Sequence, residues 1–170
     1  MKNVVNLDEV VLHPRPPEFR PDDAATAAKY DARMGMLGAM IGTVQLGCNI
    51  TLIPPGKRAF PFHNHRVNEE LFIILEGQGE LRYGGQHRAV RANDVISCPA
   101  GGPETAHQIV NTGSADLKMI AISTQRMPEI CDYPDSGKFG LLAEFPSHSD
   151  TAAYRHITRE ADCRDYWENE

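Results

Sequence analysis

The strongest constraint on the fold of this chain is a series of short β-rich runs between residues 40 and 125. The runs are GTVQLGCNITLI, EELFIILEG, GELRYGG, QHRAVRAND, DVISCP, HQIVNTG and LKMIAIST. The clusters between them, such as PPGKR, PAGGPE and NTGSAD, are rich in residues that favour turns. Short strands that follow one another at such regular spacing predict an all-β sandwich or barrel.

The two ends of the chain differ from this middle part. Residues 1–20 predict an arm, with a short strand in EVVLHP followed by the Pro-rich HPRPPEFRP. Asp22 and Asp23 precede a run of helix formers, which predicts a short N-terminal helix. We therefore divide the chain into an arm with a short helix (1–39), a β-barrel (40–125) and a C-terminal extension that packs on the barrel (126–170).

Composition narrows the range of functions. The 170 residues, 41% of them hydrophobic, suit one globular domain with a substantial core. The net charge of −6 argues against nucleic acid as a partner, because phosphate binding needs clustered Lys and Arg. Four cysteines without a CxxC pair indicate neither a zinc knuckle nor a redox dithiol, and unpaired thiols fit a reducing cytoplasm.

We expect neither a signal peptide nor a membrane span. Asp8 and Glu9 interrupt what would be the apolar part of a signal peptide. Residues 34–56 carry no charge, but Gln45, Asn49 and several glycines make this run too polar for a spanning helix of about 20 apolar residues. We interpret the run as buried strand with glycine bends and expect a cytoplasmic protein.

A cluster of polar side chains stands directly before a buried run. His63 and His65 lie two residues apart, so on a strand both can face a barrel interior while Asn64 faces away. A hairpin would bring the carboxylate of Glu70 close to them, and a closed barrel could add the distant His107. Polar groups beside a buried strand are costly unless they are satisfied. A shared metal ion would satisfy them, whereas the alternative is a set of hydrogen-bonded core histidines without metal.

The sequence HNHRVNEELFIILEG resembles the first motif of the cupins, which are small double-stranded β-helix barrels. That motif runs glycine, five residues, HxH, three or four residues, glutamate, six residues, glycine. His63 and His65 match HxH, and Glu70 and Gly77 follow at the spacing of the motif. Gly56 precedes His63 by six rather than five residues, which departs from the motif.

The sequence NDVISCPAGGPETAHQIVN resembles the second cupin motif, with matches at Pro99, Gly101, His107 and Asn111. Two departures stand out. Asn93 occupies the place of the first glycine of the motif, and five residues rather than two separate Gly101 from His107. We expect the extra GPETA to lengthen a loop at the barrel mouth without changing the strand that carries His107.

The resemblance covers residues 40–125 and implies a cupin double-stranded β-helix, a jelly-roll-like barrel. It also implies one divalent transition metal, held by His63, His65, Glu70 and His107. Three imidazoles and one carboxylate suit Fe, Mn, Ni, Cu and Zn, so the choice of metal stays open. Four protein ligands would saturate a tetrahedral Zn, whereas an octahedral ion would keep about two positions for a substrate.

The function is left open among three hypotheses. The first is a metal-dependent enzyme, a sugar-derivative isomerase or a dioxygenase, that acts on a small oxygenated molecule. The second is a non-catalytic module that binds a sugar or small carboxylic acid, and the third is a metal-stabilised structural domain. The wording GGPETAHQIVNTG resembles a group of bacterial cupins, some labelled sugar-phosphate isomerases or auxin-binding proteins, but fold does not fix chemistry. The residues expected to face the pocket are Lys57, Gln45, Arg82, Tyr83 and Arg126.

Two expectations concern the ends of the strands and the surface. The segments GGPETA and MPEICDYPDSGK are Gly- and Pro-rich loops, which we expect to form the rim of the pocket. The arm strand DEVVLHP has little to pack against in so small a barrel. Exchange of this strand with a second copy would cover an exposed edge, so we expect a homodimer.

Overall fold

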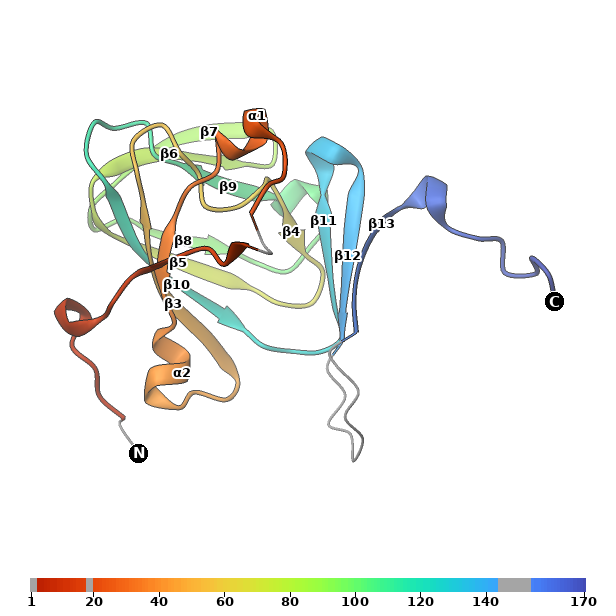
Figure 1. The fold of residues 1–170 in the computed structure, drawn as a ribbon, viewed down its shortest axis with the longest axis horizontal. Helices are drawn as coiled ribbons and strands as arrows, with labels where there is room; N and C mark the ends of the chain where they lie inside the picture. Colours follow the sequence, from red (N-terminus) through yellow and green to blue (C-terminus); the bar gives the residue numbers. More distant parts are fainter. Residues whose placement is uncertain (1–2, 18–19, 144–153) are drawn as a thin grey trace.

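The computed structural model describes residues 3–17, 20–143 and 154–170 of the protein. The remaining residues, 1–2, 18–19 and 144–153, belong to the predicted arm and C-terminal extension and lie outside the described part. Antiparallel strands build a barrel, and a smaller sheet flanks it on one side (Figure 1). The prediction of an all-β fold with a short N-terminal helix is confirmed.

Two sheets make up the barrel. The larger has six strands, in the order β1 (His13–Pro14), β2 (Arg33–Gly35), β3 (Leu46–Ile53), β10 (Leu117–Thr124), β5 (Glu70–Glu76) and β8 (Val95–Cys98). The smaller has the order β7 (Gln86–Arg91), β6 (Gln78–Tyr83) and β9 (His107–Val110). Each of the seven β-rich runs that the sequence analysis singled out contains a strand.

The core lies between these two sheets and follows from the alternation of side chains along the strands. Ile53, Ile74, Leu117 and Met119 are at most 2% exposed, and they come from the three central strands of the larger sheet. Leu81 and Ile109 close the core from the smaller sheet. Burial of these aliphatic side chains holds the two sheets together around a small interior.

A third sheet joins the C-terminal strands to the histidine segment. Its order is β13 (Tyr154–Arg159), β12 (Lys138–Ala143), β11 (Glu129–Tyr133) and β4 (Asn64–His65). In register, Cys131 lies opposite His65 and Asp132 lies opposite Asn64. The segment MPEICDYPDSGK, which was expected to be a loop, instead forms β11, a 3₁₀ turn at Pro134–Ser136 and the start of β12, and it places residues 129–133 directly beside the predicted metal site.

The N-terminal part corrects two expectations. Most of the segment expected as a strand is not extended sheet, because Asn6 caps a 3₁₀ helix at Leu7–Glu9 and pairing is confined to β1. The uncharged run is not continuous strand either. Helix α2 (Leu37–Ile41) interrupts it, and Gly42 ends that helix in a left-handed conformation at φ 80°. The predicted short helix is α1 (Ala24–Ala27), capped by the Asp23 carboxylate.

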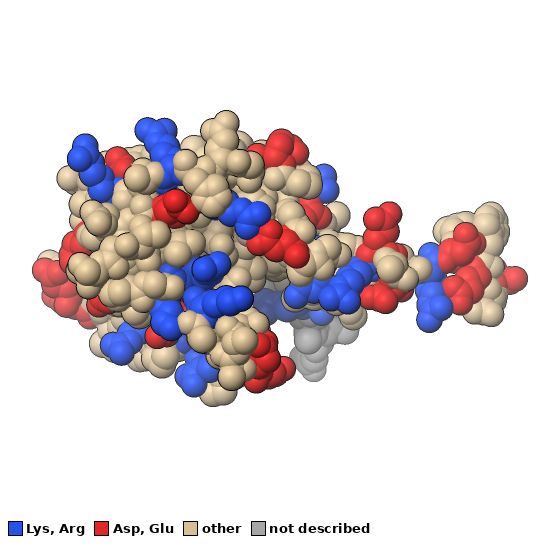
Figure 2. Space-filling view, turned by 90° about the horizontal axis from the view of Figure 1, so that it is seen from above, with Lys and Arg blue, Asp and Glu red and all other residues tan. Residues whose placement is uncertain are grey.

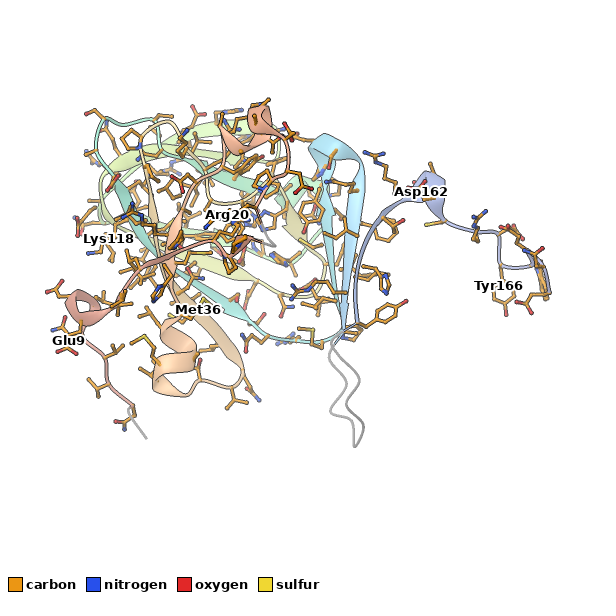
Figure 3. The ribbon with its side chains drawn as sticks, in the orientation of Figure 1. Glu9, Arg20, Met36, Lys118, Asp162 and Tyr166 are labelled. Atoms are coloured by element: carbon orange, nitrogen blue, oxygen red, sulfur yellow. The ribbon has the colours of Figure 1, made fainter. Side chains whose placement is uncertain are left out.

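The two ends of the chain lie on opposite sides of the molecule. Glu9 and Met36 lie on the side of the arm and α2, whereas Asp162 and Tyr166 lie on a segment that leaves the body beyond β13 (Figure 3). The view from above shows the same segment projecting from the barrel (Figure 2). Within the described part of the chain, no helix is long and apolar enough to cross a membrane.

Two turn positions explain why the cupin motifs have glycine at these places. Gly77, between β5 and β6, has φ +82°, and a Cβ there would lie 2.4 Å from the carbonyl oxygen of Asp116. Asn93, between β7 and β8, also adopts positive φ, at 75°. The second cupin motif has glycine at this place, and the structure shows why: the turn needs a left-handed residue, which asparagine tolerates better than most.

Candidate metal centre

Three imidazoles and one carboxylate converge inside the barrel mouth. The Nε2 atoms of His107, His65 and His63 lie 2.9, 3.4 and 3.7 Å from Oε2 of Glu70. The four residues come from β9, β4, β5 and the segment before β4, where His63 pairs with His107 in an isolated bridge. The structure therefore brings together all four residues that the sequence analysis proposed as ligands, although metal binding itself stays a prediction.

Backbone carbonyls orient two of the three rings. Nδ1 of His63 lies 2.9 Å from the carbonyl oxygen of Pro61, and Nδ1 of His107 lies 3.2 Å from that of Thr105. Because a carbonyl only accepts hydrogen bonds, each Nδ1 carries its proton there. Such a partner fixes the ring and directs Nε2 toward a metal. On these histidines, Nε2 is the atom that faces Glu70.

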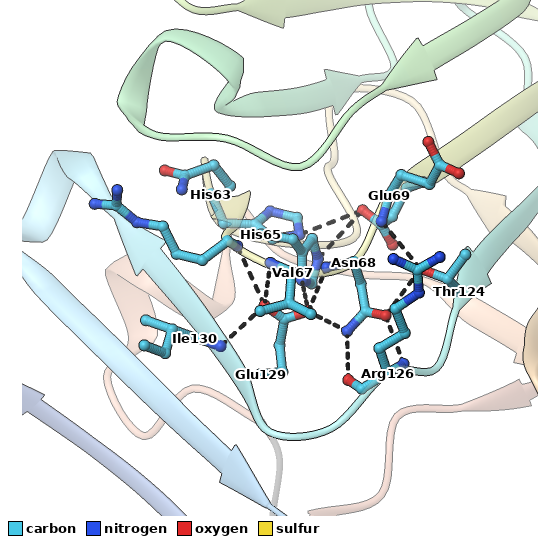
Figure 4. A network of polar contacts seen from close by, with 12 residues as sticks. His63, His65, Val67, Asn68, Glu69, Thr124, Arg126, Glu129 and Ile130 are labelled. Atoms are coloured by element: carbon cyan, nitrogen blue, oxygen red, sulfur yellow. Dashed lines mark hydrogen bonds and ion pairs between the residues drawn. The ribbon is translucent and has the colours of Figure 1, made fainter.

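A buried carboxylate stands behind the third ring. Oε2 of Glu129 lies 3.5 Å from Nδ1 of His65, and Glu129 is only 5% exposed (Figure 4). Glu129 accepts hydrogen bonds from the backbone N–H groups of Arg66, Val67, Asn68 and Ile130 and from the side-chain amide of Asn68. These donors fix the carboxylate and leave its charge facing His65. Glu129 was not among the predicted site residues, since no spacing rule links residue 129 to residue 65.

Burial and charge prepare the cluster to accept a cation. Burial lowers the pKa of His63 to about 4, so its ring is neutral at pH 7. Burial would raise the pKa of Glu70, but contacts with His107, His65 and His63 outweigh it and lower the pKa. Burial would lower the pKa of His65, but Glu70 and Glu129 outweigh it and raise the pKa. Glu70 and His63 are thus in the protonation state that a metal requires, whereas the raised pKa of His65 favours a proton that a metal would have to displace.

The donor set fits a metal ion on this geometry. His63, Glu70 and His107 each offer a ligand atom, and these atoms lie within 4.8 Å of one another. A cation at this point would replace the proton that His107 Nε2 shares with Glu70. The described residues thus include a His/Glu group that could hold a metal ion, while nitrogen and oxygen donors do not select one element.

Apolar and weakly acidic side chains surround the histidines. The ring of Tyr133 stacks on that of His63 at 6.3 Å between centroids, and Phe72 packs against His107 at 5.6 Å. Burial raises the pKa of the Cys131 thiol to about 12, and burial also raises the pKa of Tyr133. Both groups are therefore protonated at neutral pH. Tyr133 and Cys131 were not among the predicted pocket residues.

A small cavity of about 20 Å³ adjoins the cluster. It is lined by His63, His107, Gln108 and the apolar Ala59, Phe60, Phe72, Ile109 and Met119. A space of this size holds about one water molecule. This cavity reaches only His63 and His107 of the cluster, and the side chains of His65 and Glu70 are 21% and 17% exposed to solvent.

None of the five residues predicted to face the pocket lines this cavity. Arg82 makes a bidentate ion pair with Asp135, at 2.7 and 2.8 Å, and its guanidinium lies 3.7 Å from the ring centre of Phe62. Tyr83 lies opposite His107 in register but lines a different cavity, of about 310 Å³, between β6, β7 and β8. Arg82 is therefore held in an ion pair, and the cavity that Tyr83 lines includes none of the histidines.

The other three lie further out. Lys57 donates to the carbonyl oxygen of Ala28 at 2.6 Å, and Gln45 is exposed in the loop before β3. Arg126 is bonded through its backbone to the side chain of Asn68. Contact between any of these residues and a substrate stays a prediction.

The inserted loop of the second motif packs against β4. The backbone N–H of Gly101 donates to the carbonyl oxygen of His65 at 2.8 Å, and its own carbonyl accepts from the Asn64 side chain at 2.9 Å. The extra residues form a 3₁₀ helix at Pro103–Thr105. The insertion thus leaves His107 in reach of Glu70. Asn64 faces away from the cluster, as expected. It is fully buried, and its side-chain amide also donates to Asp132 at 2.8 Å.

Comparison with known proteins identifies related sequences for the barrel. The cupin domain family matches residues 49–123. An uncharacterised protein of Methanocaldococcus jannaschii is 33% identical over 72 residues, which is 42% of this chain and 54% of that protein. An oxalate-binding protein of Thermotoga maritima is 33% identical over 70 residues, 41% of this chain and 54% of that protein. The chain thus spans about half the length of these curated relatives.

Solved structures extend the likeness to nearly the whole chain. A sugar phosphate isomerase of the cupin superfamily from Silicibacter pomeroyi superposes with a TM-score of 0.77, covering 97% of this chain and 98% of that one. The sequence identity is 22%, so this likeness shows the fold alone. The agreement includes the C-terminal strands, which lie outside the segment that the family matches.

Proposed function

Because this chain is a cupin-domain protein with a His/Glu cluster at its barrel mouth, we propose that it binds one divalent transition metal there and acts on a small oxygenated molecule. The observation that carries the proposal is the convergence of three Nε2 atoms on one carboxylate oxygen. Three Nε2 atoms within 3.7 Å of one carboxylate oxygen form a donor set around one point, which a single cation would satisfy together. The carbonyl and carboxylate oxygens beside their Nδ1 atoms also support metal binding, because they orient the rings with Nε2 toward the site.

A bound octahedral ion would keep about two positions free and polarise an oxygen of the substrate as a Lewis acid. The residues of the chain supply the surroundings. Phe72 and Met119, which are 5% and 2% exposed, line the inner side of the site. Tyr133, protonated and stacked on His63, is placed to donate a hydrogen bond to an oxygen held near that ring.

The reaction type stays open between a dioxygenase and an isomerase of a sugar derivative. The small cavity does not decide it, because the side chains of His63, His65 and Glu70 are 12–21% exposed and a substrate can approach them without entering the cavity.

A second candidate is a non-catalytic module that binds a small carboxylic acid through the metal. The oxalate-binding relative, which matches part of the barrel, favours it. The cavity lining also favours it, since it includes no carboxylate that could act as a general base. In this version the metal and Tyr133 hold an acid without changing it.

Metal analysis followed by calorimetry separates these functions. We expect about one equivalent of transition metal per chain after purification without chelator, and oxalate binding that disappears after dialysis against EDTA. Oxygen uptake or conversion of the bound acid supports the enzyme, whereas acid recovered unchanged supports the binding module. A protein that takes up none of Fe, Mn, Ni, Cu or Zn on reconstitution would overturn both.

A further inference from the structure

A cysteine lies beside the histidine cluster, on the side of the third sheet. Cys131 is half-buried on β11 and pairs in register with His65 on β4. Its Sγ atom and one ring nitrogen of each of His63 and His65 all lie within 4.8 Å of one another. In the described part of the chain, the other group of this kind consists of His63, Glu70 and His107. The thiol is therefore close to the candidate ligands, although it lies outside both cupin motifs.

The pairing of β11 with β4 places the sulfur there. Side chains directly opposite each other on antiparallel strands point to the same face of the sheet. Cys131 therefore points to the same face as His65, and so does Glu129, two residues earlier on β11. The contact of Oε2 of Glu129 with Nδ1 of His65, at 3.5 Å, agrees with this placement. Strand pairing thus brings the thiol to the imidazoles without a local motif in the sequence.

The separations suit a shared ion. In zinc sites the metal–sulfur distance is about 2.3 Å and the metal–nitrogen distance about 2.0–2.1 Å, so two such ligands lie at most about 4.4 Å apart. The limit of 4.8 Å that encloses Sγ of Cys131 and the two ring nitrogens is only slightly longer. A small adjustment of the side chains therefore brings all three atoms onto one ion.

The sulfur-containing group and the group with Glu70 are alternatives for one ion, because both include His63. Nδ1 of His63 faces the carbonyl oxygen of Pro61 at 2.9 Å, which leaves Nε2 as the donor atom that this ring offers to a metal. One nitrogen lone pair binds one ion. The two groups therefore offer the same ion two donor sets, one with a carboxylate oxygen and one with a sulfur.

We propose that Cys131 is a further metal ligand, which a thiophilic ion binds together with His63 and His65. The proposal rests on the metal site of the proposed function and adds a residue that discriminates between metals. Thiolate ligands favour Zn²⁺ and Cu⁺, whereas carboxylate oxygen suits Mn²⁺. A zinc ion bound by two nitrogens and one sulfur would also keep a fourth tetrahedral position, unlike one saturated by three histidines and a glutamate.

The other three cysteines of the chain provide controls. Cys48 is half-buried on β3, Cys98 is buried on β8, and Cys163 is exposed. Among the described residues, none of these three belongs to a group that could hold a metal ion. A sulfur signal from the site should therefore disappear when Cys131 is replaced and persist when Cys48 is replaced.

Cobalt substitution tests the proposal on the full chain. Co²⁺ serves as a spectroscopic substitute for Zn²⁺, and a thiolate ligand gives it a sulfur-to-cobalt charge-transfer band in the near ultraviolet. After addition of about one equivalent of Co²⁺ to chelator-treated protein, we expect this band in the parent and in Cys48→Ser but not in Cys131→Ser. The visible d–d bands should persist in all three proteins, because the imidazoles still hold the ion. Cobalt bound by the parent without the charge-transfer band would overturn the proposal and leave the proposed function standing.

Metal affinities measure the discrimination. In competition against a chromophoric chelator, Cys131→Ser should weaken Zn²⁺ binding by at least the roughly tenfold that loss of a supporting group costs. It should leave Mn²⁺ binding unchanged, and Cys48→Ser should leave the binding of both metals unchanged. Equal zinc affinities of the parent and Cys131→Ser would overturn the proposal.

X-ray absorption of the zinc-loaded parent gives a readout that needs no variant, in case Cys131→Ser does not fold. We expect a sulfur scatterer at about 2.3 Å from the zinc, outside the shell of nitrogen ligands. A first shell made only of nitrogen and oxygen would overturn the proposal. A parent that takes up no metal would overturn both this proposal and the proposed function, so the two failures are distinguishable.

Discussion

Two sides of the histidine cluster are built differently. His63 and His107 are oriented by backbone carbonyls of the barrel, whereas His65 faces the side-chain carboxylate of Glu129. These carbonyls belong to Pro61 and Thr105, two residues before each histidine, so the local backbone places them. Glu129 comes from β11, beyond the segment 49–123 that the cupin domain family matches. Of the candidate ligands, Glu70 and His107 therefore lie on barrel strands and His65 lies on β4 of the flanking sheet, while the charge behind His65 is supplied by the C-terminal extension.

The largest expected effect, on metal content and on melting temperature, concerns His107 on barrel strand β9. Replacing His107 by Ala removes a donor from the shared site, so the variant should lose most of its metal. A metal that binds only the folded state stabilises it by about 4 kcal/mol at a thousandfold excess over its dissociation constant. In metal-replete buffer His107→Ala should therefore melt several degrees below the parent, and chelator should change its melting temperature little. Mass spectrometry of metal content and thermal melts check this.

His87→Ala is the control for this variant. His87 is exposed on β7 and pairs with Glu80 on the surface, where an ion pair contributes little. It should keep the metal content and melting temperature of the parent. A His107→Ala protein with full metal occupancy would show that His107 is not a ligand.

In the metal-free protein, His63 and His65 should make the free energy of unfolding depend on pH in opposite directions. The unfolded chain protonates His63 near its ordinary pKa of 6.5, but the folded protein does so only near 4. Between these values the unfolded state binds more protons, so stability should fall by roughly 3 kcal/mol as pH falls. The lowered pKa of Glu70 acts in the same direction below 4.5, where its stabilising charge is lost.

His65 has the opposite sign. Its pKa is raised, so its contribution is present below pH 6.5 and is lost as pH rises through the folded value. Urea unfolding in EDTA between pH 4 and 8 should show a flatter acid limb for His63→Ala and a steeper one for His65→Ala. A parent protein that is more stable at pH 4.5 than at pH 6.5 would contradict the assignment of His63.

The carboxylate side can be weakened without touching a ligand. Glu129→Gln removes the charge behind His65 and points an amide N–H₂ at backbone N–H donors. Loss of such a supporting group costs 10–100-fold in metal affinity, or about 1.4–2.7 kcal/mol. We expect a loss in that range by competition against a chromophoric chelator.

Asp132→Asn serves as the control on the same strand. Asp132 accepts hydrogen bonds from Asn64 and Arg66 but not from a histidine. Its affinity for metal should stay close to that of the parent. Equal affinities of Glu129→Gln and the parent would mean that His65 needs no carboxylate behind it.

This contrast also separates what the sequence could predict from what it could not. The strands of the barrel follow from local signals, the alternation of apolar residues and the turn residues between them. The sequence analysis correctly brought His63, His65 and Glu70 together, but the hairpin expected to do so is not formed: β4 pairs with β11, and β5 pairs with β10 and β8. The residues concerned are close to one another in sequence or are matched by a motif.

The missed features depend on pairing between distant segments. Glu129 reaches His65 only because β11 pairs with β4 across more than sixty residues, and no local pattern encodes that pairing. The predicted pocket residues failed to line the cavity for a related reason. Arg82 was chosen as an inward neighbour on a strand, but Asp135 lies close enough to draw it into an ion pair.

The smallest expected effect concerns Asn93, which lies in the barrel away from Glu129. At its φ of 75° the backbone is in the left-handed region, and this conformation costs a residue other than Gly, Asn or Asp about 1–2 kcal/mol. The turn itself is held by backbone bonds from Asn93 to Ile74 at 2.8 Å and from Asp94 to Arg91 at 3.0 Å, which need no particular side chain. Asn93→Ala should therefore lower the melting temperature by a few degrees, whereas Asn93→Gly, the residue of the motif, should stay near the parent. Both should keep full metal content, because no candidate ligand lies in this turn. If alanine were tolerated as well as glycine, the left-handed conformation at this position would not be what the motif glycine serves.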